Sequence, residues 1–341
     1  MDPNMYETSD DIDSHTLIVL HTLHEEIPAS SWRIFRIIHI ILTVCSLIGN
    51  CVLLLVAYSL VNRLTPPIQL VTNLCFANML AAWSVVTMYF PHTSCQEEIQ
   101  TALLMTAHNA CALTLVSYVI AYYVAIFKPL EYSVIVSRRR VWIAIAVIWA
   151  VALLCAHSHF FITLVIHKPG TLYCYQVFYN TCIALILCIA VAGILLLIAA
   201  FVITRTMLYL RPIMAFVDPN QTQVEPRKST YETTTIILVI VLYLVTWIPY
   251  LITAFAHIDV HNTDEGYETA IAMFSCMSFV LLNCVAFPII FGVRLESLLI
   301  GYERLYLKIR QWSSDTCTRL SNRLKREEQA TSPLNPIESV F

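Results

Sequence analysis

Seven apolar segments, each long enough to cross a lipid bilayer, constrain this chain more than any other feature. A membrane-spanning helix needs about 20 predominantly apolar residues. Runs of that kind occur at 34–60, 68–90, 99–127, 141–166, 177–204, 234–256 and 270–292. The chain is 58% hydrophobic and 13% charged, which is too apolar for a soluble domain of 341 residues. We therefore predict an all-α membrane protein, a seven-transmembrane helix bundle.

The distribution of basic residues predicts how the bundle is oriented. Lys and Arg that flank a span are retained in the cytoplasm. With the N-terminus outside, only Arg33, Arg36 and Lys168 of the 20 basic residues face outwards, and 17 face inwards. An acidic segment without a basic region precedes the first span, so we expect a retained anchor rather than a cleaved signal peptide. We predict a multi-pass plasma-membrane protein with an extracellular N-terminus and a cytoplasmic C-terminus.

The composition along the chain divides it into four parts. Residues 1–31 are predicted to form an extracellular tail and residues 32–293 the bundle. In the segment 294–311, apolar residues recur at helical spacing with charged residues elsewhere, which is typical of a short amphipathic eighth helix on the inner membrane surface. These apolar residues are Leu295, Leu298, Leu299, Tyr302, Leu305, Tyr306 and Ile309. The polar segment 312–341 is predicted to be a disordered cytoplasmic tail.

Several classes of function are excluded by what the spans lack. No Asp, Glu, Lys or Arg lies in the central part of any span, which argues against a coupled transporter. An intramembrane enzyme would need polar catalytic groups there, and only isolated Asn, Ser, Thr, His and Tyr occur. The pairs His21/His24 and His157/His159 lack a third ligand, so no metal site is predicted. We expect no catalysis, no cofactor and no nucleic-acid partner.

Three of the 12 cysteines, Cys95, Cys174 and Cys182, are predicted at the outer surface, where disulfides form. A Cys174–Cys182 or a Cys95–Cys174 bridge is compatible with the sequence, which does not choose between them. At the opposite end, Ser339 stands two places before the terminal Phe341, a pattern that adds as a strand to PDZ-type grooves. A PDZ-domain protein is therefore a predicted partner, beside membrane lipid.

Short motifs follow one another through the spans in a fixed order. They are Leu47-Ile-Gly-Asn50 in span 1, Asn73-Leu-Cys-Phe-Ala-Asn-Met-Leu80 in span 2, Ala121-Tyr-Tyr-Val-Ala-Ile-Phe-Lys-Pro-Leu130 after span 3, Trp149 in span 4, Thr246-Trp-Ile-Pro-Tyr250 in span 6 and Asn283-Cys-Val-Ala-Phe-Pro-Ile-Ile-Phe-Gly-Val-Arg294 in span 7. Their order and spacing resemble the rhodopsin-like G-protein-coupled receptors over residues from about 32 to 310. The resemblance implies a receptor fold.

The chain departs from this family at the positions that the resemblance implies are its activation switches. Ala121 and Tyr122 stand where the family has Asp and Arg, and Asn78 replaces the aspartate of span 2. A sodium ion of the family's kind is not expected, because a hard cation prefers charged oxygen ligands. The predicted switch positions are Asn50, Asn78, Cys111, Ala121, Tyr122, Tyr123, Trp247, Pro249, Phe287, Pro288 and Phe291.

The resemblance also implies a ligand cavity between the outer halves of spans 3, 6 and 7. Leu104 occupies the place of the aspartate that amine-binding members carry, so a monoamine is not expected. An apolar lining suits a hydrophobic or lipid-like ligand, while acidic residues around the mouth favour a basic peptide as an alternative. The candidate lining residues are Thr101, Leu104, Met105, His108, Trp247, Tyr250, Leu251, Ala254, His257, Met273 and Met277.

Two further departures resemble one branch of the family. Glu97 replaces the usual outer cysteine of span 3, and span 5 lacks the usual proline, as in the melanocortin, lysophospholipid and cannabinoid receptors. That branch often bridges its second outer loop to itself, which implies Cys174–Cys182. We predict a receptor for an extracellular hydrophobic or peptide ligand, with unusual or basal coupling to a heterotrimeric G protein or arrestin. The alternatives are a non-signalling ligand sink or scaffold and an olfactory-type chemoreceptor.

Overall fold

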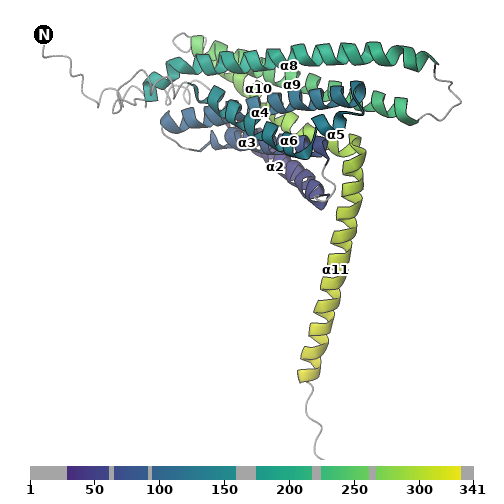
Figure 1. The fold of residues 1–341 in the computed structure, drawn as a ribbon. Coiled ribbons are helices and arrows are strands. Elements are labelled where there is room, and N and C mark those ends of the chain that lie inside the picture. The colour runs from purple at the N-terminus through teal and green to yellow at the C-terminus, as the bar shows by residue number, and fades with distance from the viewer. Residues whose placement is uncertain are drawn as a thin grey trace, which may run out of the picture.

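The computed structural model describes residues 29–60, 65–90, 94–158, 174–216, 224–260 and 266–331. Seven of the helices in these ranges are long and apolar enough to cross a membrane, as predicted. They lie side by side in one bundle (Figure 1). These helices are α2 (Ala29–Ser59), α3 (Pro66–Thr87), α4 (Ser94–Phe127), α6 (Arg138–Ala156), α8 (Cys174–Phe216), α9 (Val224–Val260) and α10 (Gly266–Arg294).

The predicted bounds of spans 1, 2, 3 and 7 hold to within about five residues, whereas α8 continues to Phe216 beyond the predicted end at 204 and α9 begins at Val224 before the predicted start at 234. The span of α6 is shorter than predicted. We expected this span to run to residue 166, but the helix ends at Ala156. His157 leaves helical geometry with φ −102° and ψ 14°, and its N–H donates to the carbonyl oxygen of Leu153. At the other end, the Ser137 side chain accepts a hydrogen bond from the Arg140 N–H, a typical N-cap. The apolar run alone did not mark the C-terminal end of this helix.

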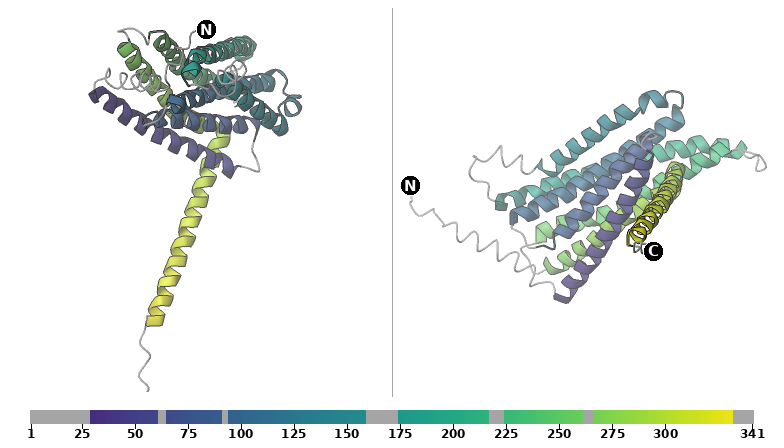
Figure 2. Two further views of the ribbon diagram at one scale, coloured as in Figure 1. Left: turned by 90° about the vertical axis from the view of Figure 1, so that its left-hand side faces the viewer. Right: turned by 90° about the horizontal axis from the view of Figure 1, so that it is seen from below.

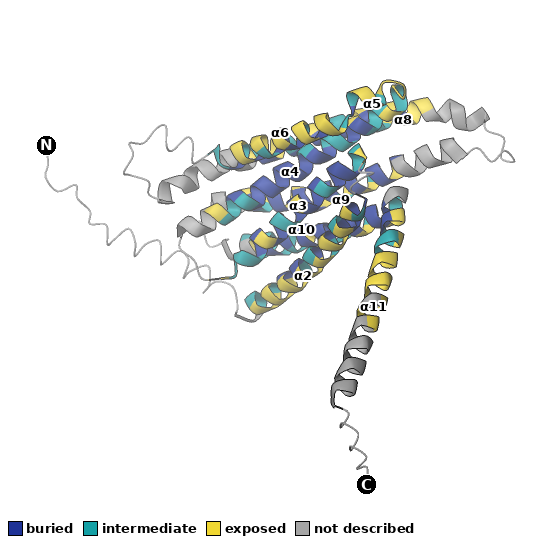
Figure 3. Ribbon diagram, turned by 60° about the horizontal axis from the view of Figure 1, so that its bottom comes forward, coloured by how far each residue is buried: buried dark blue, intermediate teal, exposed yellow. Residues whose placement is uncertain are grey.

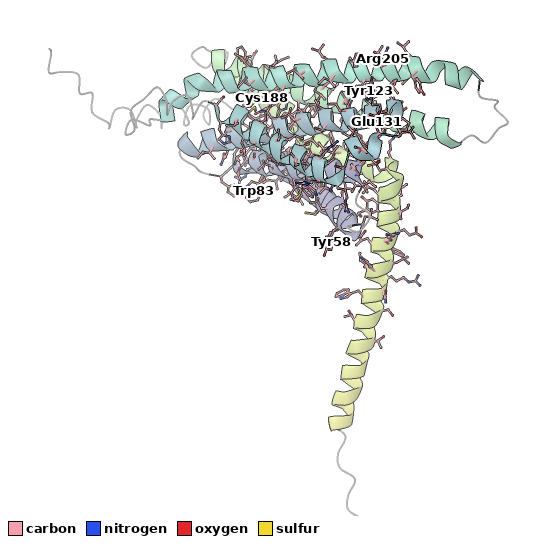
Figure 4. The ribbon with its side chains drawn as sticks, in the orientation of Figure 1. Tyr58, Trp83, Tyr123, Glu131, Cys188 and Arg205 are labelled. Atoms are coloured by element: carbon pink, nitrogen blue, oxygen red, sulfur yellow. The ribbon has the colours of Figure 1, made fainter. Side chains whose placement is uncertain are left out.

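The helices differ in how much of their surface the bundle covers. α3 and α4 lie among the other helices and present mostly buried side chains, whereas α2, α6 and α8 each keep one outward face exposed (Figure 3). The exposed faces are apolar, with Ile34 on α2, Trp142 on α6 and Leu197 on α8. Tyr58 and Trp83 also lie on the outside of the bundle (Figure 4). An apolar outer surface is what a bundle surrounded by lipid requires.

One further long helix, α11 (Glu296–Thr331), begins where α10 ends and runs across the bundle axis instead of along it (Figures 1 and 2). We call this end of the bundle the α11 end and the opposite one the far end. Gly301 lets α11 approach α2, because a Cβ there would stand 2.7 Å from Val56 and 2.9 Å from Leu60. Burial against the bundle raises the pKa of the Tyr302 hydroxyl, which therefore stays neutral.

The length of α11 corrects the prediction of a helix ending at 311 and a disordered tail from 312. The helix continues to Thr331. Neither glycine nor proline interrupts the sequence between Gly301 and Pro333, and Leu, Arg, Lys, Glu and Gln in that stretch are good helix formers. The apolar pattern of 294–311 marks the first part of the helix, in which Leu298, Tyr302 and Leu305 pack against the bundle. Ser339 and Phe341 lie outside the described residues.

Candidate functional site

Most of the predicted ligand-binding side chains come together in the far half of the bundle. They belong to the main apolar core, to which α2, α3, α4, α6, α8, α9, α10 and the start of α11 all contribute, and most are almost fully buried. Met273 is partly buried against this core, and Thr101 is half-buried near the far end of α4. The side chain of His257 lies outside the described residues. The buried members are Leu104, Met105, His108, Trp247, Tyr250, Leu251, Ala254 and Met277.

His108 is the polar centre of this region. Its Nδ1 lies 2.8 Å from the Tyr243 hydroxyl, and its Nε2 lies 3.3 Å from the carbonyl oxygen of Cys188. A carbonyl oxygen only accepts, so this contact assigns the proton to Nε2 and leaves Nδ1 to accept from Tyr243. The imidazole also lies against the Trp247 indole, with ring centroids 4.6 Å apart. Residues of α4, α8 and α9 are thereby joined around one side chain.

Two polar atoms beside this centre have no hydrogen-bond partner among the described residues. They are the Nε1 of Trp247 and the Oδ1 of Asn109, whose amide Nδ2 donates to the Cys188 sulfur at 3.3 Å. Both side chains are fully buried. Buried polar atoms in proteins are nearly always paired, with protein, water or ligand. One unpaired donor and one unpaired acceptor are therefore available to a polar group of a bound molecule.

A second polar cluster near the far end had no place in our sequence predictions. The buried His39 of α2 lies 2.8 Å from Ser278 of α10 and also contacts the Tyr89 hydroxyl. Trp32 and Phe274 pack around Tyr89, with ring centroids 5.3 Å and 6.4 Å from it. In the sequence, the only sign of this cluster was a histidine, His39, inside an apolar span. His39 alone did not predict the cluster, because its partners Tyr89 and Ser278 lie far from it in sequence.

The middle of the bundle carries the predicted switch positions of spans 1, 2, 3 and 7. The amide Nδ2 of Asn50 donates to the Cys284 carbonyl oxygen at 3.1 Å, and the Cys111 thiol donates to Asn78 Oδ1 at 3.5 Å. Phe287 is buried beside them in the same core. The residues do not fit a sodium ion, because this set contains a thiol and neutral amides but no carboxylate. The absence of sodium binding expected from Asn78 stays a prediction.

At the α11 end, the predicted switch residue Tyr122 and the charged Arg294 each contact a threonine of α9. The Tyr122 hydroxyl of α4 is hydrogen-bonded to the Thr233 hydroxyl of α9. Arg294 of α10 reaches Thr235 of α9 with its Nη1 at 3.4 Å. Ala121 is buried and apolar. The ends of α4, α9 and α10 nearest α11 are thus connected through threonine hydroxyls of α9, which sequence reasoning did not identify.

The aromatic residues among the predicted switch positions pack against other aromatic side chains. Phe291 contacts both Phe287 and Tyr118, with ring centroids 5.8 Å apart in each pair. Tyr123 stacks on Phe127 at 4.5 Å. Pro288 packs on α2, where a Cβ at Gly49 would stand 3.1 Å from it. Pro249 lies on the exposed side of α9.

Three helices are tied together by the amide of Asn73 in α3. Its Nδ2 donates to the Thr114 hydroxyl of α4 at 2.7 Å, and its Oδ1 accepts from the Trp149 indole of α6 at 2.7 Å. Asn73 is buried, so both hydrogen bonds are shielded from solvent. The two motif residues Asn73 and Trp149, which lie far apart in sequence, therefore meet in the fold.

The surface of the α11 end carries exposed apolar and basic side chains between α4 and α6. Leu130 is 95% exposed and Val134, in the short helix α5 (Tyr132–Ile135), is 64% exposed. Arg138, Arg139 and Arg140 are exposed beside them, and Arg140 donates to the Val134 carbonyl oxygen at 2.7 Å. Arg205 of α8 is exposed as well (Figure 4). This surface combines an apolar projection with positive charge.

A bundle of seven membrane-length helices, with a buried tryptophan and histidine at the far half, defines a seven-helix membrane receptor. A sequence profile described as 7 transmembrane receptor (rhodopsin family) matches residues 29–291, and the chain belongs to this family. No curated protein sequence matches the chain significantly. The family assignment predicted from the motifs is confirmed. The chain is accordingly a G-protein-coupled receptor and a multi-pass protein of the plasma membrane, and members of its family are receptors and not enzymes.

The family profile does not distinguish between branches, so the melanocortin, lysophospholipid and cannabinoid branch stays a prediction. The candidate bridge Cys174–Cys182 lies outside the described side chains. The cysteines whose side chains are described carry free thiols, and they lie in the spans as expected: Cys45, Cys51, Cys75, Cys111, Cys155, Cys188, Cys276 and Cys284.

Proposed function

We propose that this receptor binds an extracellular hydrophobic ligand in the far half of its bundle and signals to the cytoplasm with raised basal activity. The far end is the extracellular one in this proposal, and the α11 end is cytoplasmic. The observation that carries the proposal is the Tyr122–Thr233 hydrogen bond, which stands where the family has an arginine. The resting contact between α4 and α9 is thus uncharged.

The chemistry of the far half supports a hydrophobic ligand with few polar atoms. Among the described residues, no Asp, Glu, Lys or Arg is buried. A charged amine or carboxylate would therefore meet no counter-ion and would bear the full cost of desolvation. The unpaired Nε1 of Trp247 is a donor, so it suits one hydroxyl or carbonyl oxygen on an otherwise apolar molecule. A basic peptide attracted by an acidic mouth is the less favoured ligand.

The strength of the inner contact supports raised basal signalling. A neutral hydrogen bond contributes about 0.5–1.5 kcal/mol, whereas a hydrogen bond to a charged group contributes about 1.5–3 kcal/mol. A resting state held by the weaker contact lies closer in free energy to its alternatives. Since about 1.4 kcal/mol changes a population tenfold, the alternative state is more populated without ligand.

The exposed surface at the α11 end supports a cytoplasmic partner. Leu130 projects almost completely from the surface, beside the basic residues Arg138–Arg140. Exposed apolar side chains rimmed by charge are typical of protein–protein contact sites. We propose this surface as the contact for a heterotrimeric G protein, with arrestin as a second occupant of the same side.

The experiment is a measurement of basal second messengers in cells that display the receptor. Wild type is expected to exceed untransfected cells, and Tyr122→Phe to raise the signal by up to about tenfold, since one hydroxyl contact is lost. Tyr123→Phe is the matched control, because no hydrogen bond is described for its hydroxyl. Equal surface expression of all variants is measured with a tag.

Absence of any signal at equal surface expression would overturn the proposal. The double change Ala121→Asp and Tyr122→Arg then decides between the remaining functions. A receptor with a lost switch gains ligand-driven or basal signal from it, whereas a ligand sink or scaffold gains none. Tags on the two termini test the proposed orientation separately, since they must report opposite sides of the membrane.

A further inference from the structure

Arg205 of α8 is an exposed cation that the proposed function does not use. It lies near the end of the membrane-spanning part of α8, which runs from Ile186 to Tyr209. No hydrogen bond or ion pair is described for its side chain within the ranges that the structure covers. Figure 4 places Arg205 on α8 and Tyr123 on α4 toward the same end of the bundle. A cation at this depth is stable only with a partner or with access to the headgroup region of the bilayer.

Aromatic side chains flank Arg205 on the same face of α8. Phe201 precedes it by four residues and Tyr209 follows it by four, and side chains four residues apart lie above one another on a helix. Phe201 is 58% exposed and Tyr209 is 47% exposed, so both rings reach the outer surface of the bundle. We call these three residues the α8 row. The row is about 12 Å long at 1.5 Å per residue, and the cation stands between its two rings.

Two half-buried rings of α4 support this row from the bundle side. Tyr123 stacks on Phe127 with ring centroids 4.5 Å apart. The same pair contacts both ends of the row. The centroid of Tyr123 lies 6.4 Å from that of Phe201, and the centroid of Phe127 lies 5.1 Å from that of Tyr209. The four rings form one continuous series across α4 and α8, so the packing of α4 fixes where the rings of the row stand.

The depth and the chemistry of the α8 row specify the molecule that lies against it. A phospholipid has its headgroup at the level where the spans end and its acyl chains along their apolar surface. An Arg side chain reaches the interface from within a span, and its guanidinium binds phosphate oxygens with two parallel N–H donors. The hydroxyl of Tyr209 is a further donor, and no hydrogen bond to a described residue is found for it. Phe201 lies one turn deeper, at the level of the acyl chains.

The charge of Arg205 favours an anionic headgroup over a zwitterionic one. A choline group would bring a second cation close to the guanidinium, and like charges repel. At the same end of the bundle, the carboxylate of Glu131 lies 3.1 Å from Lys128, so its charge is already matched. A net negative lipid therefore suits this site better than phosphatidylcholine.

We propose that the α8 row is a binding site for one anionic phospholipid, with Arg205 and Tyr209 at the phosphate and an acyl chain against Phe201. The row lies within the span, so lipid and not a soluble protein is the molecule that covers it. It is separate from the surface around Leu130 that we propose for the G protein. The proposed orientation implies that the lipid belongs to the inner leaflet, whereas the preference for anionic lipid does not depend on that orientation.

The test is a site-specific cross-link from Leu208, which is 58% exposed and lies three residues after Arg205. Leu208 is replaced by the photo-crosslinking residue p-benzoylphenylalanine in the full-length receptor. The receptor is placed in nanodiscs of equal parts phosphatidylcholine and phosphatidylserine, and the cross-linked lipids are identified by mass spectrometry. We expect phosphatidylserine to exceed phosphatidylcholine about fivefold, the factor by which one basic residue at the membrane surface attracts an anionic lipid.

Variants assign this excess to the α8 row. Arg205→Gln is expected to return the ratio to the composition of the disc, and Arg205→Lys to keep most of the excess. Arg139→Gln is the matched control, because it removes another exposed arginine of the same end and should leave the ratio unchanged. The same cross-linker at Leu197, which is 72% exposed and about two turns deeper on α8, should report the composition of the disc.

A ratio at Leu208 equal to the composition of the disc would overturn the proposal. An excess of phosphatidylserine that survives Arg205→Gln would overturn it as well, because the row would then not be its cause. The measurement needs neither a ligand nor a G protein, so failure of this proposal is distinct from failure of the proposed signalling function.

Discussion

The far half and the α11 half of the bundle differ in which side chains form their buried hydrogen bonds. In the far half, the polar atoms belong to aromatic side chains: His108 is hydrogen-bonded to Tyr243 and lies against Trp247. In the α11 half, the polar atoms belong to hydroxyl groups, as in the Tyr122–Thr233 hydrogen bond. Both halves keep unpaired buried atoms, Trp247 Nε1 and Asn109 Oδ1 in the far half and Gln69 Oε1 and Thr206 Oγ1 towards the α11 end. We propose ligand recognition for the far half and a neutral contact between α4 and α9, the Tyr122–Thr233 hydrogen bond, for the α11 half.

The largest expected effect concerns the α11 half alone. Gly301→Ala places a Cβ 2.7 Å from Val56, so α11 must shift away from α2. We expect a loss of up to about 3 kcal/mol of stability, measured by chemical unfolding of the purified receptor. Gly193→Ala adds the same methyl group where nothing lies within 4 Å. It is expected to be neutral or stabilising, since alanine favours helix over glycine by about 1 kcal/mol. Equal destabilisation by both changes would contradict the close approach at Gly301.

An intermediate effect on stability is expected at the Trp149–Asn73 hydrogen bond, between the two halves. Trp149→Phe removes the indole that donates to Asn73 and leaves a buried amide oxygen unpaired. The cost of such an atom is about 1–3 kcal/mol, and unfolding is the measurement. Trp83→Phe is the control, because Trp83 is exposed on the same bundle and no hydrogen bond is described for it. If Trp83→Phe proves as costly as Trp149→Phe, the hydrogen bond is not what stabilises this region.

The smallest effect should appear in the far half. Tyr243→Phe removes the hydroxyl that lies 2.8 Å from His108 Nδ1 and 3.1 Å from the His108 carbonyl oxygen. We expect a loss of about 1 kcal/mol in stability, with basal signalling unchanged because the α11 end is untouched. Tyr58→Phe, at a 75% exposed position, is the control. A large change in basal signal from Tyr243→Phe would break the separation of the two halves.

The fold could be predicted from the sequence because bilayer thickness fixes the length of each apolar run. The ends of α6 and α11 could not, since Phe160 and Ile162 continue an apolar pattern and the polar residues after 312 suit both a tail and a helix. The motif residues Asn73 and Trp149 were recognised by resemblance, and the fold brings them into contact. Their partner Thr114 was not predicted, because threonine in a membrane helix is common and carries no sequence signal by itself.

Part of the packing around the candidate site could be predicted from helical spacing, whereas its function as a ligand site stays a prediction. Helical spacing put Leu104, Met105 and His108 on one face of α4, and all three are buried in the core. Tyr243 and Cys188, which hold His108, come from two other helices and have no fixed separation from it in sequence. The inner threonines of α9 were missed likewise. Contacts between helices depend on their rotation and register, which hydropathy does not specify.

The Asn73 amide has a consequence for how the molecule moves. The amide is hydrogen-bonded to the Thr114 hydroxyl and to the Trp149 indole at the same time, and so connects α3, α4 and α6. α9 is not part of this hydrogen-bonded group of α3, α4 and α6, and it packs mainly against α8 and α10. α8 and α10 also pack on α4 and α3, so α9 is the helix of this group that contacts the three bonded helices least. A rearrangement that connects the two faces of the bilayer is therefore expected to displace α9 the most relative to them.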